Sequence, residues 1–367
     1  MGEMTQLHGP AIPALETHDE RLGHVGPRPV GTANACKPRG TDAEGLGPAS
    51  QRSRYHRFRD YLFRRYARRI HKIPLDAGFG CPHREGTDHR QAPGCIYCEN
   101  AAFSPHAGTE PHPAPLDEQL ERGIRFGGKR YRSSGFFAYF QAYTNTYGPT
   151  EDLEQRYSVI RRFPEIVGLA VGTRPDCVDE AVLDLLESFS QDYEVWVEYG
   201  LQSALNPTLD RIQRGHTVED FLHAVERTSR RRILICVHVM LGLPGESHEE
   251  MMQTARVLAG LPIQGVKIHH CHVIKGTPLA ALYHEGKYRP LSYSEYLRSV
   301  CDFLEHLPWP ITIQRLLGEA PRDLLIAPKW GKDKGKVLRE IQSELERRGS
   351  HQGIRSKGRG LSEDEDG

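Results

Sequence analysis

Residues 78–98 have the sequence GFGCPHREGTDHRQAPGCIYC, which places Cys81, Cys95 and Cys98 in one segment rich in glycine and proline. The spacing of these three cysteines is C-x13-C-x2-C, and no fourth cysteine lies nearby. Three thiolates can ligate three irons of a [4Fe–4S] cluster and leave the fourth iron open to another ligand. The spacing therefore favours a cluster site with one open iron.

Two other features of this segment bear on that interpretation. Tyr97 directly precedes the last cysteine and would place an aromatic face beside the open iron. The alternative is a structural zinc site, in which His83 or His89 supplies the fourth ligand. The cysteine spacing alone leaves both sites open.

The composition sets wider limits. The chain has 367 residues, of which 26% are charged, and its formal net charge is zero, so total charge indicates no partner. Eight cysteines without a signal peptide are typical of the reducing cytosol, where thiolates bind metals or act in catalysis. No apolar run approaches the roughly 18 residues of a membrane-spanning helix. We therefore expect a cytoplasmic protein without a membrane anchor.

Both ends of the chain look unstructured. Residues 1–50 contain no Phe, Trp or Tyr and many Gly and Pro, so they cannot bury enough apolar surface to offset the entropy of ordering. Cys36 lies in this extension, and we interpret it as incidental. Residues 349–367 form a polar tail that ends in acidic residues. We predict that both segments are disordered.

Residues 52–70 predict a basic helix. Tyr55, Phe58, Leu62 and Tyr66 recur at helical spacing, among eight arginines and a single acid, Asp60. A solvated helix face is the plain interpretation, but arginine also binds phosphate through two parallel hydrogen bonds, which favours a nucleic-acid partner. A second basic cluster consists of Lys329, Lys332, Lys334 and Lys336. We predict that the two clusters bracket the opening of the substrate site.

Short apolar runs alternate with helical patterns from residue 72 onward. Strands are expected near residues 72–78, 136–143, 166–172, 194–199, 233–241 and 265–273. Helices are expected near residues 116–130, 151–162, 177–189, 207–213, 218–230, 247–260 and 292–306. This alternation predicts an α/β fold with parallel strands, either a barrel or part of one, and six strands are fewer than the eight of a closed barrel.

The chain after residue 285 has a different pattern. A helix at 292–306, a strand at 310–314 and a helix at 334–347 predict a small α+β extension that caps the barrel opening. The predicted domains are thus a core at 51–285 and an extension at 286–348.

Six further motifs follow the cysteine segment in order: FQAYTNTYG (140–148), VGTRPD (171–176), VEYGLQS (197–203), RIQRGHT (211–217), HVMLGLPGES (238–247) and KIHHCHVIKGTPL (267–279). Together they resemble a radical S-adenosylmethionine (SAM) enzyme, in the bacterial branch related to the catalytic subunit of Elongator. The resemblance covers about residues 53–345. It implies a partial (β/α)6 barrel and a [4Fe–4S] cluster on the three cysteines. It also implies reductive cleavage of SAM to a 5′-deoxyadenosyl radical. Most such enzymes use C-x3-C-x2-C, so the long gap marks the branch.

In such barrels the functional residues follow the carboxyl ends of the strands. The resemblance places Gln141 and Asn145, after the second strand, near the amino and carboxylate groups of SAM, although the family's usual Gly-Gly-Glu run is absent. Arg174 follows the third strand and is a candidate ligand residue. The neighbouring Asp176 is expected to cap the next helix.

The later strands supply four more candidate contacts. The resemblance favours SAM contacts for Glu198 and Gln202, approach of Arg214 to SAM or substrate, and an adenine-side loop at Gly245. Glu198 lies in an apolar stretch, so its carboxylate needs a partner, either a structural arginine or the hydroxyls of a ligand.

The run from His269 to His272 suggests a second metal site at first sight. In a strand, however, Lys267, His269 and Cys271 would share one face while His270 and His272 share the other. A tetrahedral site needs convergent ligands, so barrel-lining residues are the favoured interpretation. Three other cysteines are predicted to be small core residues: Cys177, Cys236 and Cys301.

The resemblance also suggests a substrate, because its nearest members are implicated in modifying the wobble uridine of transfer RNA. It implies tRNA as a partner and remodelling of a 5-substituted uridine side chain. It further implies an electron donor such as flavodoxin or ferredoxin. Two alternatives stay open: a radical SAM enzyme for a small molecule such as a tetrapyrrole precursor, and a non-catalytic RNA-binding module carrying zinc or a cluster. No catalytic side chain is assigned, and no acetyltransferase segment is apparent.

Overall fold

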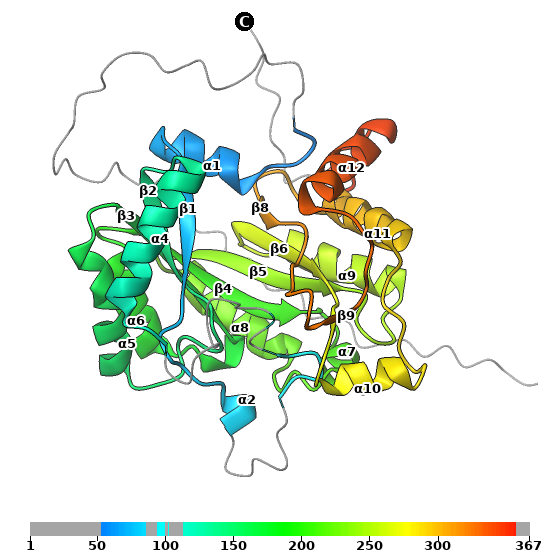
Figure 1. The fold of residues 1–367 in the computed structure, drawn as a ribbon, viewed down its shortest axis with the longest axis horizontal. Coiled ribbons are helices and arrows are strands. Elements are labelled where there is room, and N and C mark those ends of the chain that lie inside the picture. Colours follow the sequence, from blue (N-terminus) through cyan, green and yellow to red (C-terminus); the bar gives the residue numbers. More distant parts are fainter. Residues whose placement is uncertain (1–52, 86–93, 100–101, 103–112, 357–367) are drawn as a thin grey trace, which may run out of the picture. The chain divides into compact units, whose positions relative to one another are not determined.

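The computed structural model describes residues 53–85, 94–99, 102 and 113–356 (Figure 1). The predictions for residues 1–50, for Cys36 and for His89 lie outside this part of the chain. At the other end, the described chain continues to residue 356, past the predicted start of the disordered tail at 349. Ser350 and Gln352 are buried there. The prediction for residues 349–356 is therefore wrong.

Seven parallel strands form one curled sheet in the order β1-β2-β3-β4-β5-β6-β8. Their bounds are β1 (Ile70–Leu75), β2 (Gly135–Phe140), β3 (Ile166–Thr173), β4 (Glu194–Gln202), β5 (Leu234–Leu241), β6 (Gly265–His270) and β8 (Thr312–Arg315). All six residues of β2 are buried, as expected for a parallel sheet with both faces covered. The predicted α/β fold and partial barrel are confirmed.

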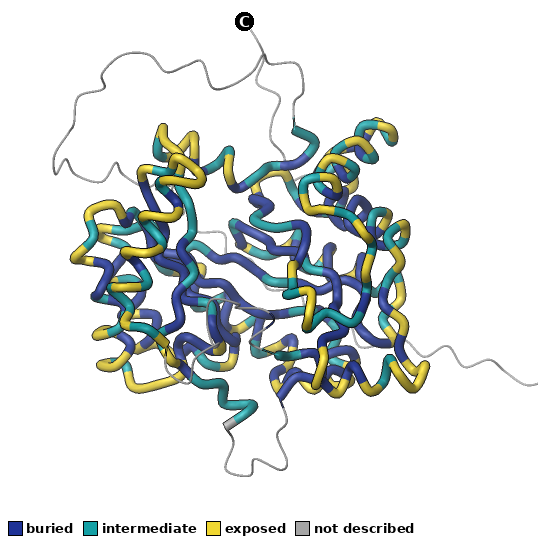
Figure 2. Tube along the Cα trace, viewed as in Figure 1, coloured by how far each residue is buried: buried dark blue, intermediate teal, exposed yellow. Residues whose placement is uncertain are grey.

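Helices connect consecutive strands, and their outer faces are among the exposed parts of the described chain (Figure 2). They are α4 (Leu116–Tyr131), α5 (Thr150–Tyr157) with the 3-10 turn Ser158–Arg162, α6 (Glu180–Phe189), α7 (Asn206–Arg211), α8 (Val218–Ser229), α9 (His248–Ala259) and α11 (Tyr293–His306). Thr217, Ser247 and Ser292 each begin a helix with a reciprocal capping box. None of the helices among the described residues is long and apolar enough to cross a membrane.

The sheet holds one strand more than the six expected. The predicted strand at 310–314 is present as β8, but it pairs in parallel with β6 and so extends the main sheet. Beyond it, β9 (Leu325–Ala327) pairs antiparallel with β7 (Val273–Ile274), and α12 (Lys334–Arg347) packs against α11. The chain on both sides of residue 285 contributes strands to the main sheet. The domain boundary at that residue stays a prediction.

Helix α1 (Phe58–Tyr66) covers the end of the sheet where the strands begin. Phe58 packs edge-to-face on Trp196, with ring centroids 5.4 Å apart, inside the curl of the sheet. Since α1 leads directly into β1, it lies at the amino end of that strand, whereas the short helix α2 (Pro82–Glu85) follows its carboxyl end (Figure 1). This helix is shorter than the predicted 52–70, and Tyr55 precedes it.

The segment before α1 joins the two edges of the sheet. Arg57 forms an isolated parallel bridge with Ile313 of β8. The amide of His56 donates to Oε1 of Gln352 at 2.9 Å, and that of Arg54 donates to Oε1 of Gln342 at 3.0 Å. The beginning and the end of the described chain therefore hold each other in place.

Candidate functional site

A cavity lies at the carboxyl ends of the strands, where the cysteine segment closes over the sheet. Its lining combines thiols, arginines, amides and imidazoles: Cys81, Arg84, Cys95, Tyr97, Cys98, Tyr139, Gln141, Tyr143, Thr144, Gly172, Thr173, Arg174, Glu198, Gly200, Gln202, Arg214, His238, Met240, His269 and Arg315. Six of the eight predicted cofactor contacts are among them: Tyr97, Gln141, Arg174, Glu198, Gln202 and Arg214.

The three predicted cluster ligands border this one cavity. The backbone of Ile96 accepts from Leu279 at 2.9 Å and donates to Ile212 at 3.1 Å, which fixes the segment between Cys95 and Cys98. Burial, followed by the nearby Cys95 thiolate, raises the pKa of Cys98 to about 12. A bare thiolate is therefore unfavourable here, and a metal must displace the proton on binding.

The donor set can be tested for its fit to a cluster. The ligand sulfurs of a single tetrahedral zinc ion lie about 3.8 Å apart, whereas each cluster ligand binds a different iron. Among the described residues, three ligand atoms lie within 4.8 Å of one another at Glu198, Cys236 and His238, and the three cysteines form no such group. The cysteine arrangement fits a cluster better than one zinc ion. Nε2 of His83, one of the two histidines considered as a fourth zinc ligand, hydrogen-bonds the carbonyl of Gln213 at 2.7 Å.

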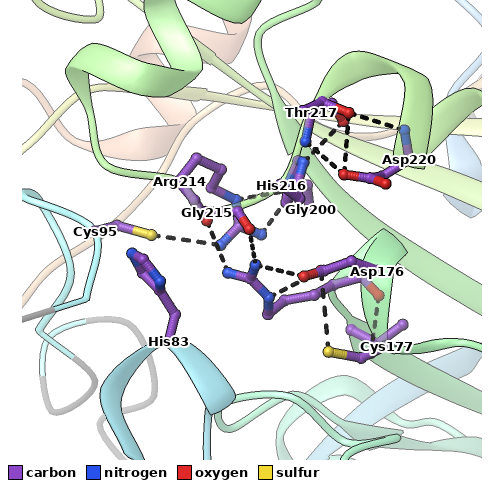
Figure 3. A network of polar contacts seen from close by, with 12 residues as sticks. His83, Cys95, Asp176, Cys177, Gly200, Arg214, Gly215, His216, Thr217 and Asp220 are labelled. Atoms are coloured by element: carbon purple, nitrogen blue, oxygen red, sulfur yellow. Dashed lines mark hydrogen bonds and ion pairs between the residues drawn. The ribbon is translucent and has the colours of Figure 1, made fainter. Parts of the chain in front are cut away.

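Arg214 connects the cysteine segment to the sheet. Its Nη1 donates to Sγ of Cys95 at 3.4 Å, while its Nη2 donates to the carbonyl of Gly200 at 2.7 Å (Figure 3). His216 approaches the same carbonyl at 3.1 Å, and burial lowers the pKa of its imidazole to about 4. The guanidinium is buried, so the positive charge faces Cys95 with little screening by water.

Arg174 holds the turn that carries Arg214. It pairs with Asp176 at 2.7 Å, and it donates to the carbonyls of Arg214 and Gly215 at 2.8 and 3.0 Å. Gly215 has a φ of +72°, a conformation that favours glycine. Asp179, not Asp176, caps α6, so the predicted cap is wrong: Asp176 is occupied by Arg174.

Glu198 lies on the floor of the cavity with a fully buried carboxylate. It accepts from Lys72 at 2.6 Å, from His238 at 2.8 Å and from Lys267. These three cationic or polar donors replace the arginine or ligand hydroxyls expected as its partner. Although burial opposes ionisation, Lys267 and Lys72 hold the pKa of Glu198 well below its usual value. Burial lowers the pKa of Lys267 to about 7.

Two predicted contacts do not line the cavity. Asn145 is buried, and its side-chain amide donates to the carbonyl of Gly172 at 2.8 Å, which fixes the loop after β2. Gly245 has a φ of +70° and lies close to the guanidinium of Arg211, which donates to the carbonyl of Pro244. Both residues shape loops in this structure.

The histidine run divides as the strand pattern predicts. Lys267 and His269 face the cavity side, where His269 is part of the lining. His270 and His272 pair with each other through Nε2 atoms 2.6 Å apart, and His270 stacks on Trp330 with centroids 4.2 Å apart. Of the three predicted core cysteines, Cys236 and Cys301 are fully buried, but Cys177 is half-buried beside Asp176.

Sequence reasoning missed several lining residues. His238 lies two residues before Met240 on β5, and both line the cavity, so the two-residue period of a strand was a signal that could have identified it. Arg84 follows the first cysteine within α2 and borders the cavity. Arg315 ends β8, a strand that the sequence pattern assigns to the extension.

The two basic clusters do not bracket the cavity. Arg65 pairs with Glu194, the first residue of β4, and Arg68 donates to the carbonyl of Ser134, just before β2. The basic helix therefore lies at the amino ends of the strands, opposite the ends that carry the cysteine segment. In the second cluster, Lys332 pairs with Glu340 and Lys334 with Glu319, so much of its charge is neutralised.

The comparison with known proteins explains this architecture. A model of the Radical SAM superfamily matches residues 78–258, and one of the Radical_SAM C-terminal domain matches residues 263–347. An uncharacterized protein of Methanocaldococcus jannaschii is 37% identical over 80% of this chain and 90% of its own length. YtqA of Bacillus subtilis is 36% identical over 82% and 92%. The chain belongs to the radical SAM superfamily.

The chain is therefore a radical SAM enzyme, and the cofactors of this family are a [4Fe–4S] cluster and SAM. More distant similarity links it to the tRNA uridine(34) acetyltransferase of M. jannaschii, 27% identical over 44% of this chain and 30% of that protein. The solved structure of Methanocaldococcus infernus Elp3 shares the fold, with a TM-score of 0.57 and 17% identity over 77% of this chain and 64% of that one.

Proposed function

We propose that this radical SAM enzyme modifies the side chain of a wobble uridine in transfer RNA. The substrate assignment rests on the similarity to tRNA uridine(34) acetyltransferases over 44% of the chain. The similar segment amounts to 30% of that relative. It therefore supports shared recognition of a uridine and does not extend to acetyl transfer.

In this proposal Cys81, Cys95 and Cys98 ligate the cluster. When bound, the cluster and SAM together supply a carbon radical that removes a hydrogen atom from the substrate. The chain's own residues position and protect these groups. Tyr97, which directly precedes Cys98, is 6% exposed, and its buried ring helps to keep water away from the cluster.

Gln141 and Gln202 offer amide donors and acceptors for SAM at the ends of β2 and β4. Both line the cavity. Gln202 has a φ of +76° beside a register shift in β4, so its backbone conformation is one that side chains rarely adopt. Strain of this kind persists where the surrounding structure fixes it, often at ligand sites. Arg174 acts as a positioning residue, since its guanidinium is taken up by Asp176 and two carbonyls.

A basic surface supports RNA as the partner. Arg125, Lys129 and Arg130 project from α4, next to an exposed Phe126 and Tyr131. Arg68 and Arg69 join this group through hydrogen bonds to Ser134 and Tyr131. We call these seven residues the α1–α4 surface. Interleaved cations and exposed aromatic rings suit a phosphate backbone with unstacked bases.

This surface lies at the amino ends of the strands, whereas the cysteine segment lies at their carboxyl ends, so a long polyanion is favoured. A tRNA can contact the α1–α4 surface with one part while its anticodon loop reaches the cavity with another. The proposal includes a one-electron donor such as flavodoxin or ferredoxin and a cytoplasmic location.

The test is mass spectrometry of tRNA nucleosides from cells that lack this protein, with the wild-type gene and a Cys81→Ala gene restored separately. Loss of one modified wobble uridine, restored by the wild-type gene alone, is the expected result. The mass difference between the missing nucleoside and its accumulated precursor identifies the reaction. An unchanged nucleoside profile would remove tRNA from the proposal and leave the family assignment intact.

A further inference from the structure

A register shift turns Arg315 toward the cavity. In the pairing of β6 with β8, Gly265 faces Thr312 and Val266 faces Ile313, but Lys267 faces Arg315, so Gln314 is an extra residue. Without this bulge, strict alternation would place Arg315 on the same side of the strand as Ile313, which packs in the main hydrophobic core. Bulges that re-aim a side chain occur often beside active sites. The bulge places Arg315 on the side of Lys267, in the lining of the cavity.

Arg315 differs from the other arginines of the lining. Arg174 donates hydrogen bonds to Asp176 and to backbone carbonyls. Arg214 donates to Cys95 and to the carbonyl of Gly200. Arg84 lies close enough to Cys98 for its charge to oppose the burial that raises the pKa of this thiol, so a cluster would supply its counter-charge. Arg315 makes no hydrogen bond or ion pair with any of the described residues through its side chain.

The charge around Arg315 is unbalanced. Glu198 is the one acidic side chain among the described residues that line the cavity. Lys72 and Lys267 already bind its carboxylate. Burial keeps the neighbouring imidazoles of His238 and His269 neutral by lowering their pKa values. An unpaired charge in a partly buried site is costly unless a ligand compensates it.

We propose that Arg315 binds an oxyanion of the substrate, a phosphate or a carboxylate, inside the cavity. The planar guanidinium matches both groups through two parallel hydrogen bonds. His238 and His269, whose rings lie 5.9 Å apart, line the same part of the cavity and can donate or accept as the substrate requires. This inference rests on the cavity alone and does not depend on the proposed tRNA substrate.

Inorganic phosphate is the first probe. Reconstituted protein with SAM bound is titrated with phosphate by calorimetry at constant ionic strength, as wild type, as Arg315→Gln and as Arg315→Lys. Loss of the charge-assisted pair should weaken binding at least about tenfold in Arg315→Gln. Arg315→Lys, which keeps the charge but loses the planar fork, should fall between the two. Arg230→Gln, which replaces an exposed arginine at the C-terminal end of α8, is the matched control and should bind phosphate like wild type.

Equal phosphate affinity in wild type and both Arg315 variants, or no phosphate binding by the wild type, would overturn the proposal. SAM affinity is measured on the same proteins, because the carboxylate of SAM is another possible oxyanion. An unchanged SAM affinity is expected. A tenfold loss of SAM affinity in Arg315→Gln would assign Arg315 to the cofactor and also overturn the proposal.

Two nucleoside pairs then distinguish the sources of the oxyanion, and this arm alone rests on the proposed function. Uridine 5′-monophosphate is compared with uridine, and 5-carboxymethyluridine with 5-methyluridine. If Arg315→Gln removes the higher affinity of uridine 5′-monophosphate over uridine, the oxyanion is a backbone phosphate. If it removes the higher affinity of 5-carboxymethyluridine over 5-methyluridine, the oxyanion is a carboxylate on the base. If no nucleoside binds while phosphate still depends on Arg315, the uridine substrate fails and the oxyanion site stands.

Discussion

Arg214 donates a hydrogen bond to the Sγ atom of Cys95 across 3.4 Å, although 119 positions of sequence separate the two residues. The same guanidinium holds the carbonyl of Gly200 at the end of β4. One side chain thus links the cysteine segment to the sheet and places a buried positive charge beside a proposed cluster ligand. Hydrogen bonds and charge near the sulfurs are among the factors that set the reduction potential of such clusters.

Replacing Arg214 should therefore shift that potential. In Arg214→Gln the positive charge is removed, so the more negative, reduced cluster is less stabilised and its midpoint potential should become more negative. Arg214→Lys, which keeps a charge, should shift it less. A redox titration followed by electron paramagnetic resonance measures the change, with iron content as the control. A potential unchanged in Arg214→Gln at full iron content would contradict this role.

The cysteine assignments predict iron content directly. Cys81→Ala, Cys95→Ala and Cys98→Ala should each lose most of the roughly four irons of a cuboidal cluster after anaerobic reconstitution. Cys177→Ala, which removes a half-buried thiol beside Asp176, should keep them. Cys36→Ala should also keep them. Tightly bound zinc in place of iron in the wild-type protein would refute the cluster assignment.

Glu198 should matter first for folding. Its buried carboxylate compensates Lys72 and Lys267, so Glu198→Gln leaves two ammonium groups without their anion and should cost about 3–5 kcal/mol of unfolding free energy. The double variant Glu198→Gln with Lys267→Met should cost less than the sum of the single changes, because the second change removes an unpaired charge. Chemical denaturation measures both. A selective loss of SAM affinity at unchanged stability would instead indicate direct contact with the cofactor.

Glu246 should make stability depend on pH. Burial raises the pKa of its carboxyl from 4.5 to about 7, while Ser203 donates to it at 2.6 Å. The folded protein thus holds this proton more tightly than the unfolded chain, and stability should fall as pH rises from 4.5 to about 7. Relative to wild type, Glu246→Gln should gain melting temperature across that interval.

Glu250, whose charge contributes to the raised pKa of Glu246, provides a comparison of opposite sign. Hydrogen bonds from Ser247 lower the pKa of Glu250, so its contribution is present above its usual pKa of 4.5 and is lost as pH falls below that value. The difference between wild type and Glu250→Gln should therefore shrink at low pH. Melting curves with the same pH dependence in both variants would show that burial does not set the protonation of Glu246.

The α1–α4 surface should govern how salt affects tRNA binding. The triple variant Arg125→Gln, Lys129→Gln, Arg130→Gln should lower the slope of log affinity against log salt by about one for each phosphate that it no longer neutralises. A matched variant, Arg256→Gln with Arg298→Gln, removes exposed charges from α9 and α11 and should leave the slope unchanged. Filter binding between about 50 and 200 mM salt measures both. Equal slopes in the triple variant and wild type would exclude this surface from RNA binding.

The fold was predictable from sequence because its signals are local. The apolar run of β2 and the serine and threonine caps of α8, α9 and α11 each act within a few residues. The place of β8 was not predictable in this way, since its pairing with β6 depends on a crossover through α11. The position of α1 relative to the cavity was not predictable for a similar reason: a run of arginines indicates a partner but not which end of a sheet it faces.

The site shows the same division. The cysteine spacing and the motifs after each strand identified most of the lining, because parallel strands bring their carboxyl ends together. The partners of Glu198 could not be read from sequence, since Lys72, His238 and Lys267 come from three different strands. Arg315 could not be found either, because a single extra residue in β8 reverses the side on which it emerges.

The joining of residues 54–57 to the far end of the described chain has a consequence for how the enzyme is made. Arg54 and His56 are made long before their partners Gln342 and Gln352, which follow 288 and 296 positions later. Interactions between such distant positions form slowly, since a long loop must close first. The segment before α1 therefore gains these partners only after residue 352 has been made. Until then residues 54–57 do not join the two edge strands of the half-barrel, β1 and β8.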